Sequence, residues 1–291
     1  AHKDIVKEVV LLDIRGDFAK GKALDTWEQA PIDYYSTMVR GTDNYKDTKN
    51  SDIVVITAGI PRKPGMSRDD LISTNAKIVA SVTKSIIKYS KKPIIIVVSN
   101  PLDVMTYAAW KASGLDASRV MGMAGILDTA RYRAFLAEEL NVSPKDLQAV
   151  LMGGHGDTMV PLPRYTTVAG IPVTEMIDKD KLKAIVERTK KGGGELVKLM
   201  GTSAWYAPGA AAAQMVESII KDDNRIFPCC VRLTGEYGLK NIFLGVPVKL
   251  GKDGITQKLE LKLNKTEMKS LHKSADAVKS VMKTFEKMKI S

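Results

Sequence analysis

Pro93-Ile-Ile-Ile-Val-Val-Ser-Asn100 is an unbroken apolar run that ends on two small polar residues. Because no polar residue interrupts it, the run is typical of a strand buried on both faces in a parallel sheet. Asp52-Ile-Val-Val-Ile-Thr-Ala58 and Glu8-Val-Val-Leu-Leu-Asp-Ile14 have the same pattern. We therefore expect all three runs to be buried strands of one parallel sheet.

Helical patterns separate these runs, over residues 20–29 and 71–90. Strands that alternate with helices predict a doubly wound α/β fold, in which ligands lie beyond the carboxyl ends of the strands. Asp13, Gly59 and the pair Ser99-Asn100 occupy those ends. We expect a nucleotide to lie against this edge of the sheet.

A glycine motif that such a nucleotide site normally has does not occur in residues 1–291. Dinucleotide-binding folds place Gly-x-Gly-x-x-Gly about 20 residues before the acid that binds the adenosine ribose. With Asp13 as that acid, the glycines would precede Ala1. We therefore expect the polypeptide in the cell to carry a further strand and the glycine turn ahead of this residue.

The second half of the chain has a mixed α+β pattern. It predicts helices over residues 129–141, 180–200, 209–220 and 265–289, and strands over residues 226–234, 242–250 and 257–263. We expect two domains, residues 1–126 and residues 127–291, that share one cleft.

Composition excludes several classes of protein. No apolar run reaches the roughly 18 residues of a membrane-spanning helix, and the first residues lack a signal-peptide pattern, so we expect a cytoplasmic protein. The adjacent cysteines Cys229 and Cys230 suit neither a disulfide framework nor a metal site. The net charge of +11 attracts anions, but the lysines are interleaved with acids and no nucleic-acid motif accompanies them. Nucleic acid is therefore not expected as the primary partner.

The segment Val150-Leu-Met-Gly-Gly-His-Gly-Asp-Thr-Met-Val-Pro161 presents one histidine between glycines after an apolar strand. The backbone can approach a ligand closely there, and an imidazole exchanges protons near neutral pH. His155 is therefore a candidate acid and base. The alternative is a buried structural histidine beside a tight turn.

Asp128 and Arg131 are spaced to lie on one face of a helix. A carboxylate bonded to one imidazole nitrogen would orient His155 and favour its protonated form. The guanidinium beside it would bind a substrate carboxylate. The alternative is an Asp–Arg pair that only stabilises the first turn of its helix.

Gly59-Ile-Pro-Arg-Lys-Pro-Gly-Met-Ser-Arg68 is a cationic loop that follows a strand end. A loop of this kind can close over an anionic substrate and exclude water. The alternative is a solvated surface loop whose charges contribute little. Its position at the carboxyl edge of the sheet favours the functional interpretation.

Taken together, these segments resemble the lactate and malate dehydrogenase family, most closely the malate dehydrogenases of its lactate-dehydrogenase-like branch. The resemblance extends over essentially the whole chain. It rests on Leu11-Leu-Asp13, Gly21-Lys-Ala-Leu-Asp25, Thr57-Ala-Gly-Ile-Pro-Arg-Lys-Pro-Gly-Met-Ser-Arg68, Val98-Ser-Asn-Pro-Leu-Asp103, Gly125-Ile-Leu-Asp-Thr-Ala-Arg131 and Gly153-Gly-His-Gly-Asp-Thr-Met-Val-Pro161.

The resemblance implies NAD-dependent hydride transfer between (S)-malate and oxaloacetate. His155 would move the proton, paired with Asp128, and Arg131 would bind the C1 carboxylate. Arg68 would polarise the substrate carbonyl as the loop closes. Arg62 would pair with the second carboxylate, at a position where lactate enzymes of the family carry an uncharged residue.

The resemblance also implies a Rossmann-type cofactor domain in residues 1–126 and a catalytic domain in residues 127–291. Asp13 would bind the adenosine ribose and favour NAD over NADP, a preference that nearby Arg15 weakens slightly. Asn100 would contact both the nicotinamide side and the substrate. Further cofactor contacts would come from Gly59, Asn75, Val98 and Ser99.

Other features implied by the resemblance are a homotetramer or homodimer, with the helix over residues 209–220 at an interface, and no need for a metal or a membrane. Two alternatives stay open at this point. One is a lactate dehydrogenase of the same fold. The other is a non-catalytic anion-binding protein that has lost cofactor binding.

Overall fold

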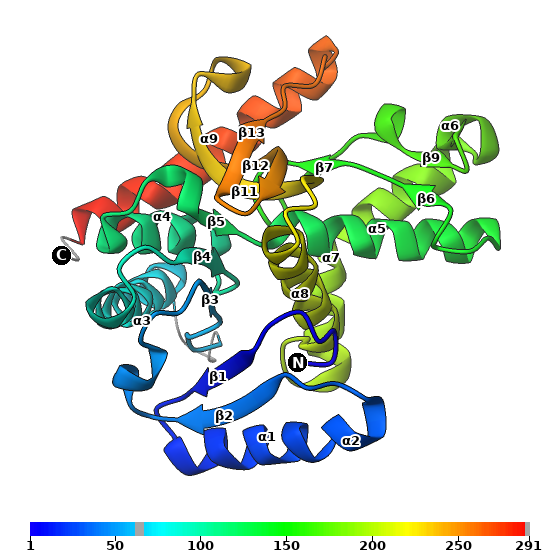
Figure 1. The fold of residues 1–291 in the computed structure, drawn as a ribbon. Helices are drawn as coiled ribbons and strands as arrows, with labels where there is room; N and C mark the ends of the chain where they lie inside the picture. The colour runs from blue at the N-terminus through cyan, green and yellow to red at the C-terminus, as the bar shows by residue number, and fades with distance from the viewer. Residues whose placement is uncertain (62–66, 289–291) are drawn as a thin grey trace.

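A six-stranded sheet forms the centre of the computed structural model, which describes residues 1–61 and 67–288 (Figure 1). In spatial order its strands are β13 (Gly254–Lys258), β12 (Lys240–Gly251), β11 (Arg225–Thr234), β5 (Val120–Gly122), β4 (Ile94–Val97) and β3 (Ile53–Ile56). β3, β4 and β5 are parallel, and β11 to β13 are antiparallel. Every residue of β4 is buried, which confirms the strand predicted from the apolar run.

The parallel and antiparallel parts of the sheet meet where Cys230 on β11 pairs with Gly122 on β5. A side chain at Gly122 has no room, since a Cβ atom there would lie 2.5 Å from Thr106 Oγ1 and 3.0 Å from Cys230 Cβ. One hydrophobic core surrounds both parts and includes side chains of β3 to β5 as well as β11 and β12. The two halves of the chain thus share both a sheet and a core.

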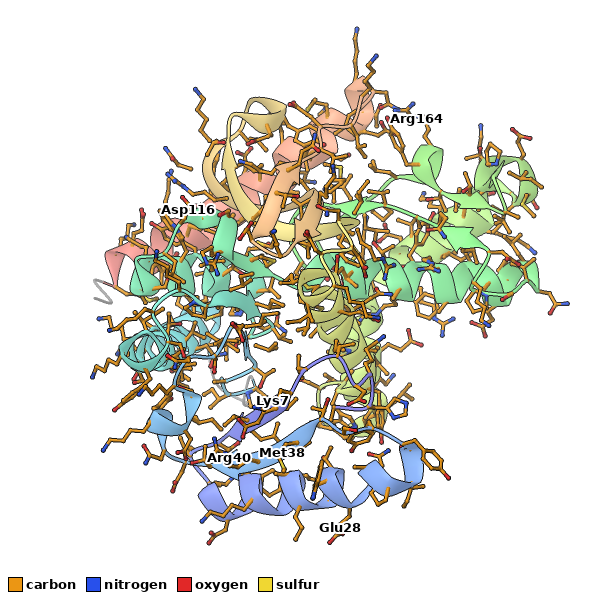
Figure 2. The ribbon with its side chains drawn as sticks, in the orientation of Figure 1. Lys7, Glu28, Met38, Arg40, Asp116 and Arg164 are labelled. Carbon is orange, nitrogen blue, oxygen red and sulfur yellow. The ribbon has the colours of Figure 1, made fainter. Side chains whose placement is uncertain are left out.

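Strand β1 (Glu8–Leu12) corrects one expectation. Instead of joining the central sheet as a strand buried on both faces, it pairs in parallel with β2 (Met38–Thr42) in a separate two-stranded sheet. Within the described residues β1 has no strand on its other edge, so its side chains are only partly buried. Glu8 Oε1 on β1 lies 3.1 Å from Arg40 Nε on β2. Figure 2 labels Arg40 and its strand neighbour Met38.

β2 was not predicted because Arg40 and Gly41 interrupt its apolar pattern. Helix α1 (Gly16–Glu28) packs on this strand. Gly41 permits the close contact, since a Cβ atom there would lie 2.2 Å from the carbonyl oxygen of Ala19.

Helices α4, α5, α8 and α9 pack against the central sheet. The bounds of the helices other than α1 are α2 (Ala30–Asp33), α3 (Arg68–Tyr89), α4 (Leu102–Ser113), α5 (Ala124–Leu140), α6 (Val173–Met176), α7 (Lys179–Met200), α8 (Tyr206–Ile220) and α9 (Lys265–Lys287). The short strands are β6 (Leu147–Gln148), β7 (Leu151–Met152), β8 (Val160–Pro161), β9 (Thr167–Val168) and β10 (Ile171–Pro172). No helix in the described part of the chain combines the length and apolar character needed to cross a bilayer.

Two predicted boundaries are wrong for identifiable reasons. α5 starts at Ala124 rather than at residue 129, because the chain enters the helix directly after β5. The strand predicted over residues 257–263 ends at Lys258, since the Leu261 N–H donates to the Tyr237 hydroxyl at 2.8 Å rather than to a neighbouring strand. The predicted end of the last helix, residue 289, lies outside the described residues.

Helix α9 begins with a capping box. The Asn264 side chain accepts from the Glu267 N–H at 2.9 Å, and the Glu267 carboxylate accepts from the Asn264 N–H at 2.8 Å. Glu267 also accepts two hydrogen bonds from Arg164, each 2.9 Å, so this end of α9 is connected to the segment after β8. Figure 2 labels Arg164.

We predict that Gly122→Ala lowers the free energy of unfolding by roughly 1–3 kcal/mol, the typical cost of an added methyl in a filled core. Gly21→Ala is the matched control, because Gly21 is an exposed position of α1 where a Cβ atom meets nothing within 4 Å. It should stabilise the protein by up to about 1 kcal/mol through helix propensity. Urea denaturation measures both, and equal stability of the two variants would contradict the packing described at the β5–β11 pair.

Candidate active site

His155 lies in the turn of a small antiparallel hairpin formed by β7 and β8. Gly153 and Gly156, on either side of it, have φ angles of +85° and +90°. Residues with a Cβ atom rarely adopt such angles, so glycines are needed to turn the chain here. The turn leaves the imidazole side chain 20% exposed.

Three consecutive backbone N–H groups of this turn donate hydrogen bonds to acceptors on three other elements. Gly153 N–H donates to the Gly245 carbonyl on β12 at 2.8 Å, and Gly154 N–H donates to Ser274 Oγ on α9 at 2.8 Å. His155 N–H donates to Asp103 Oδ2 on α4 at 3.0 Å. The backbone at Gly153, Gly154 and His155 is therefore fixed independently of any contact that the imidazole makes.

Asp128, on α5, contacts the imidazole and a guanidinium with its two oxygens. Its Oδ2 lies 2.9 Å from His155 Nδ1, and its Oδ1 accepts from Arg131 Nη1 at 3.3 Å. The Asp128 side chain is 3% exposed and that of Arg131 is 11% exposed. Because an ionised carboxylate only accepts hydrogen bonds, Nδ1 carries a proton and Nε2 is left for exchange with a ligand.

The pKa of His155 is raised above its ordinary value. Burial favours the neutral ring, but the charge and hydrogen bond of Asp128 outweigh it, and the charge of Asp103 adds to this effect. Arg131 acts in the opposite direction. The site thus favours a protonated imidazole, which is the form that donates a proton.

Gly192 on α7 makes room for Arg131. A Cβ atom at this glycine would lie 2.2 Å from Arg131 Cδ and 2.7 Å from Arg131 Nε. Because the guanidinium is already largely buried, any larger residue would force it away from its place beside Asp128.

The His155 and Arg131 side chains meet at a pocket of about 530 Å³. His155 and Arg131 line it together with Asn100, Asp103 and, on α7, Lys190 and Lys191. Its remaining lining includes apolar side chains and the bare backbone of Gly193 and Gly194. The pocket therefore combines a proton-exchanging group with several cations, as an anionic substrate requires.

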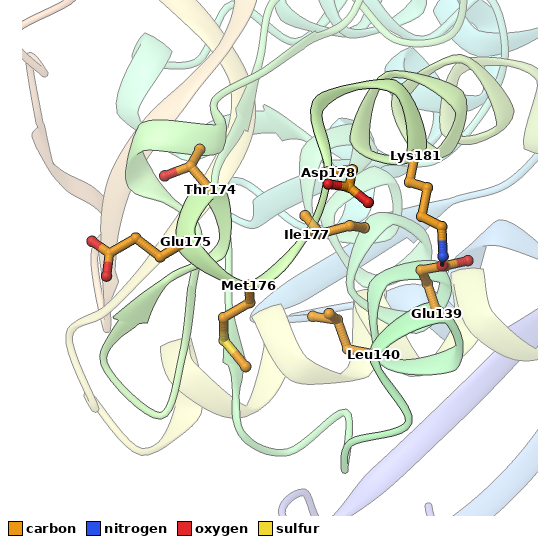
Figure 3. A pocket seen from close by; sticks show the side chains of 8 residues that line it. All are labelled: Glu139, Leu140, Thr174, Glu175, Met176, Ile177, Asp178 and Lys181. Atoms are coloured by element: carbon orange, nitrogen blue, oxygen red, sulfur yellow. Dashed lines mark hydrogen bonds and ion pairs between the residues drawn. The ribbon is translucent and has the colours of Figure 1, made fainter.

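A second hollow, of about 360 Å³, lies between the end of α5 and the start of α7 (Figure 3). Its lining includes Glu139, Glu175 and Asp178, and the ammonium of Lys181 is 2.6 Å from Glu139 Oε1. With its lysine already paired, this hollow presents mainly carboxylates and does not suit an anion.

The residues expected to contact a cofactor follow the strands as predicted, but they differ in exposure. The Asp13 carboxylate, 41% exposed, follows β1 and accepts from the Arg15 N–H at 2.8 Å. Gly59 follows β3, with φ +154°. Asn100 is exposed and lines the pocket, whereas Ser99 is buried and donates to the Ala58 carbonyl at 2.6 Å. Val98 is half-buried, and its N–H donates to the Ile56 carbonyl at 2.8 Å.

Asn75, on α3, is 2% exposed and connects two loops at this edge. Its Oδ1 accepts from the Ile60 N–H at 2.8 Å, and its Nδ2 donates to the carbonyls of Asn100 at 2.7 Å and Ile60 at 3.1 Å. The side chain thus holds the segments after β3 and β4 together.

The loop arginines complete the set of expected site residues. Arg62 lies outside the described residues. Arg68 is the first residue of α3, and its side chain lies outside the described part of the structure. Neither is placed relative to the pocket.

Sequence reasoning missed Asp103, Ser274 and Gly192. Asp103 had a signal, because it is an acid three residues after Asn100 in a segment that was already of interest. The glycines of residues 192–194 had another, since glycine is unfavourable inside a helix unless space demands it. Ser274 had none, because only the fold brings it to the hairpin.

Comparison with known proteins gives a consistent result over the whole chain. Residues 1–122 match the family model for the NAD-binding domain of lactate/malate dehydrogenases, and residues 126–289 match the model for their α/β C-terminal domain. A malate dehydrogenase of Cytophaga hutchinsonii is 63% identical over 287 residues, which cover 98% of this chain and 92% of the relative.

Solved structures agree with this comparison. A malate dehydrogenase of Salinibacter ruber has a TM-score of 0.95 and 54% identity, covering 99% of this chain and 92% of that one. A lactate dehydrogenase of Cryptosporidium parvum, solved with lactic acid and NAD, has a TM-score of 0.93 and 37% identity, covering 98% and 92% of the two chains.

We predict that Asp128→Asn lowers the pKa of His155, because burial then acts against a weaker opposing interaction. An NMR titration of the imidazole C–H signals measures this, with His2 and His272 as internal references. Asp157→Asn is the control, since it removes an exposed carboxylate two residues from the ring. A His155 pKa that is the same in Asp128→Asn and in the unmodified protein would contradict the pairing.

Proposed function

The chain belongs to the lactate/malate dehydrogenase family, and we propose that it catalyses the reversible NAD-dependent oxidation of (S)-malate to oxaloacetate. The observation that carries the proposal is the buried Asp128 carboxylate, which contacts both His155 and Arg131 at one pocket. The high identity to relatives named malate dehydrogenase favours malate as the substrate.

Proton transfer is the role we assign to His155. In oxaloacetate reduction the protonated imidazole donates from Nε2 to the C2 carbonyl oxygen, and in malate oxidation the neutral ring accepts the hydroxyl proton there. Asp128 fixes the tautomer and stabilises the charged ring during this step. The raised pKa of His155 favours the form that reduction needs.

Substrate orientation is assigned to arginines. Arg131, held by Asp128 and fitted against Gly192, would bind the C1 carboxylate through its guanidinium. The family resemblance assigns the second carboxylate to Arg62 and the C2 carbonyl to Arg68. A monocarboxylate such as pyruvate would leave the Arg62 guanidinium desolvated and unpaired, which disfavours its binding.

NAD, when bound, supplies the hydride chemistry. The exposed Asp13 carboxylate after β1 fits ribose hydroxyls, and Gly59 has no side chain to crowd Asn75 at the sheet edge. Asn100 reaches the pocket from the same edge. Ser99 and Asn75 would act by holding the loops in place, since both are buried and bonded to backbone carbonyls.

Domain roles and assembly belong to the same proposal. Residues 1–126 would hold the cofactor, and residues 127–291 would carry the proton-transfer pair. A homodimer or homotetramer is supported by large apolar side chains exposed on the described surface of α1, α7 and α8, such as Leu24, Leu199 and Tyr206. A cytoplasmic location stays a prediction.

The main alternative is a lactate dehydrogenase of the same fold, which the Cryptosporidium structure keeps relevant. It requires a neutral residue where this chain has Arg62, so the sequence favours malate. A non-catalytic anion-binding protein is the other alternative, and undetectable NAD binding would favour it.

We predict that His155→Asn lowers kcat for oxaloacetate reduction by about 10²- to 10⁴-fold, the usual contribution of a positioned acid or base. NADH affinity, measured by fluorescence titration, should stay within a few fold of the unmodified protein. His272→Asn, on α9, is the matched control and should keep its activity. Near-normal turnover by His155→Asn would remove this residue from the mechanism.

We also predict that kcat/KM for oxaloacetate exceeds that for pyruvate, and that Arg62→Gln reverses or narrows this ratio. Loss of one charged hydrogen-bonding partner should cost roughly 10- to 100-fold in kcat/KM for oxaloacetate. Arg62→Lys keeps the charge but not the bidentate geometry, so its kcat/KM for oxaloacetate should lie between those of the unmodified protein and Arg62→Gln. A preference of the unmodified protein for pyruvate would overturn the assignment of malate.

A further inference from the structure

Asp103 is a buried carboxylate that the proton-transfer scheme above leaves unused. It lies in the first turn of α4 and is 8% exposed. Its Oδ2 accepts the His155 N–H at 3.0 Å. Its Oδ1 is buried and has no hydrogen-bond partner among the described residues.

No cationic side chain of the described residues forms an ion pair with Asp103. The ionisable groups that act on it are His155 on the hairpin, Asp128 on α5 and the buried thiol of Cys230 on β11. The pKa of Asp103 is raised above its ordinary value, chiefly by burial and further by the charge of Asp128, while the His155 N–H, the Cys230 thiol and the imidazole charge oppose this effect. The anion is therefore most favourable when His155 is protonated.

His155 faces charges from several elements. Asp128 and Arg131 approach from α5 and Asp103 from α4, while Lys190 and Lys191 of α7 line the same pocket. Asp157 follows on the same hairpin, and α9 contributes apolar side chains such as Val278. Among these, Asp103 alone both bonds the His155 backbone and adds a negative charge near its ring.

We propose that Asp103 is a positioning residue that fixes the backbone of His155 and, through its charge, favours the protonated imidazole. This inference rests on the proposed function, because it assigns Asp103 a role in balancing the two directions of that reaction. An ionised Asp103 stabilises the acid form that oxaloacetate reduction uses and disfavours the base form that malate oxidation uses.

The experiment compares Asp103→Asn with the unmodified protein. The amide keeps an oxygen that accepts the His155 N–H but removes the charge. We expect the alkaline limb of kcat/KM for oxaloacetate reduction to move to lower pH, with a loss of about threefold or more on that limb. The acidic limb for malate oxidation should move the same way, so that oxidation at acidic pH becomes faster.

Opposite changes in the two directions distinguish a charge effect from damage to the fold, which would lower both rates at every pH. Ser274→Ala is the control, because it removes the neutral hydrogen bond to the adjacent Gly154 N–H. It should lower kcat without moving either limb. Asp103→Ala should move both limbs as Asp103→Asn does and also lower kcat, since the backbone bond is lost.

The NMR titration of His155 supplies a second readout that needs no turnover. A lower His155 pKa in a folded Asp103→Asn or Asp103→Ala variant supports the inference. If one of the two variants does not fold, the measurement is made on the other. Unchanged limbs and an unchanged His155 pKa in an active enzyme would overturn it while leaving the proposed function in place. Absence of oxaloacetate reduction in the unmodified protein would instead overturn the proposed function.

Discussion

The rest of the site depends on the contacts of the Asp128 carboxylate with His155 and Arg131. One buried group, 3% exposed, orients the imidazole through Oδ2 and the guanidinium through Oδ1. A buried anion is unfavourable unless it is paired, and here both partners are groups that the reaction uses. The same contact therefore offsets the cost of burying the charge, raises the pKa of His155 and sets the spacing between proton transfer and carboxylate binding.

Much of this arrangement could be predicted from the sequence, because it depends on local pattern. The apolar runs identify β3 and β4, and the spacing of Asp128 and Arg131 places them on one face of a helix. The rest depends on long-range packing. The backbone of the hairpin donates hydrogen bonds to Gly245, Ser274 and Asp103. These three residues are far apart in the sequence, and only the complete fold brings them to one turn. The partly exposed β1 was predicted wrongly for the same reason, since an apolar run does not report how many neighbouring strands it has.

Helix α7 shows how binding space is made at the expense of local stability. Glycine inside a helix costs about 1 kcal/mol relative to alanine, and residues 192–194 are all glycine. Gly192 leaves room for the Arg131 side chain, and Gly193 and Gly194 line the pocket without side chains. The rest of α7 compensates for this cost, because its apolar face packs on α5 and stabilises the helix.

The pairing of Cys230 with Gly122 has a consequence for how this fold can vary. Because the backbones of both halves are hydrogen-bonded in one sheet, a hinge between them would have to break that pairing. The shared sheet therefore opposes rotation of one half against the other. For the same reason, a chimera that joins the first half of one relative to the second half of another would be destabilised if the first half carried a side chain at position 122, where a Cβ atom meets Cys230 of the second half. The residue at position 122 is thus constrained by side chains from both halves of the chain rather than by its own half alone.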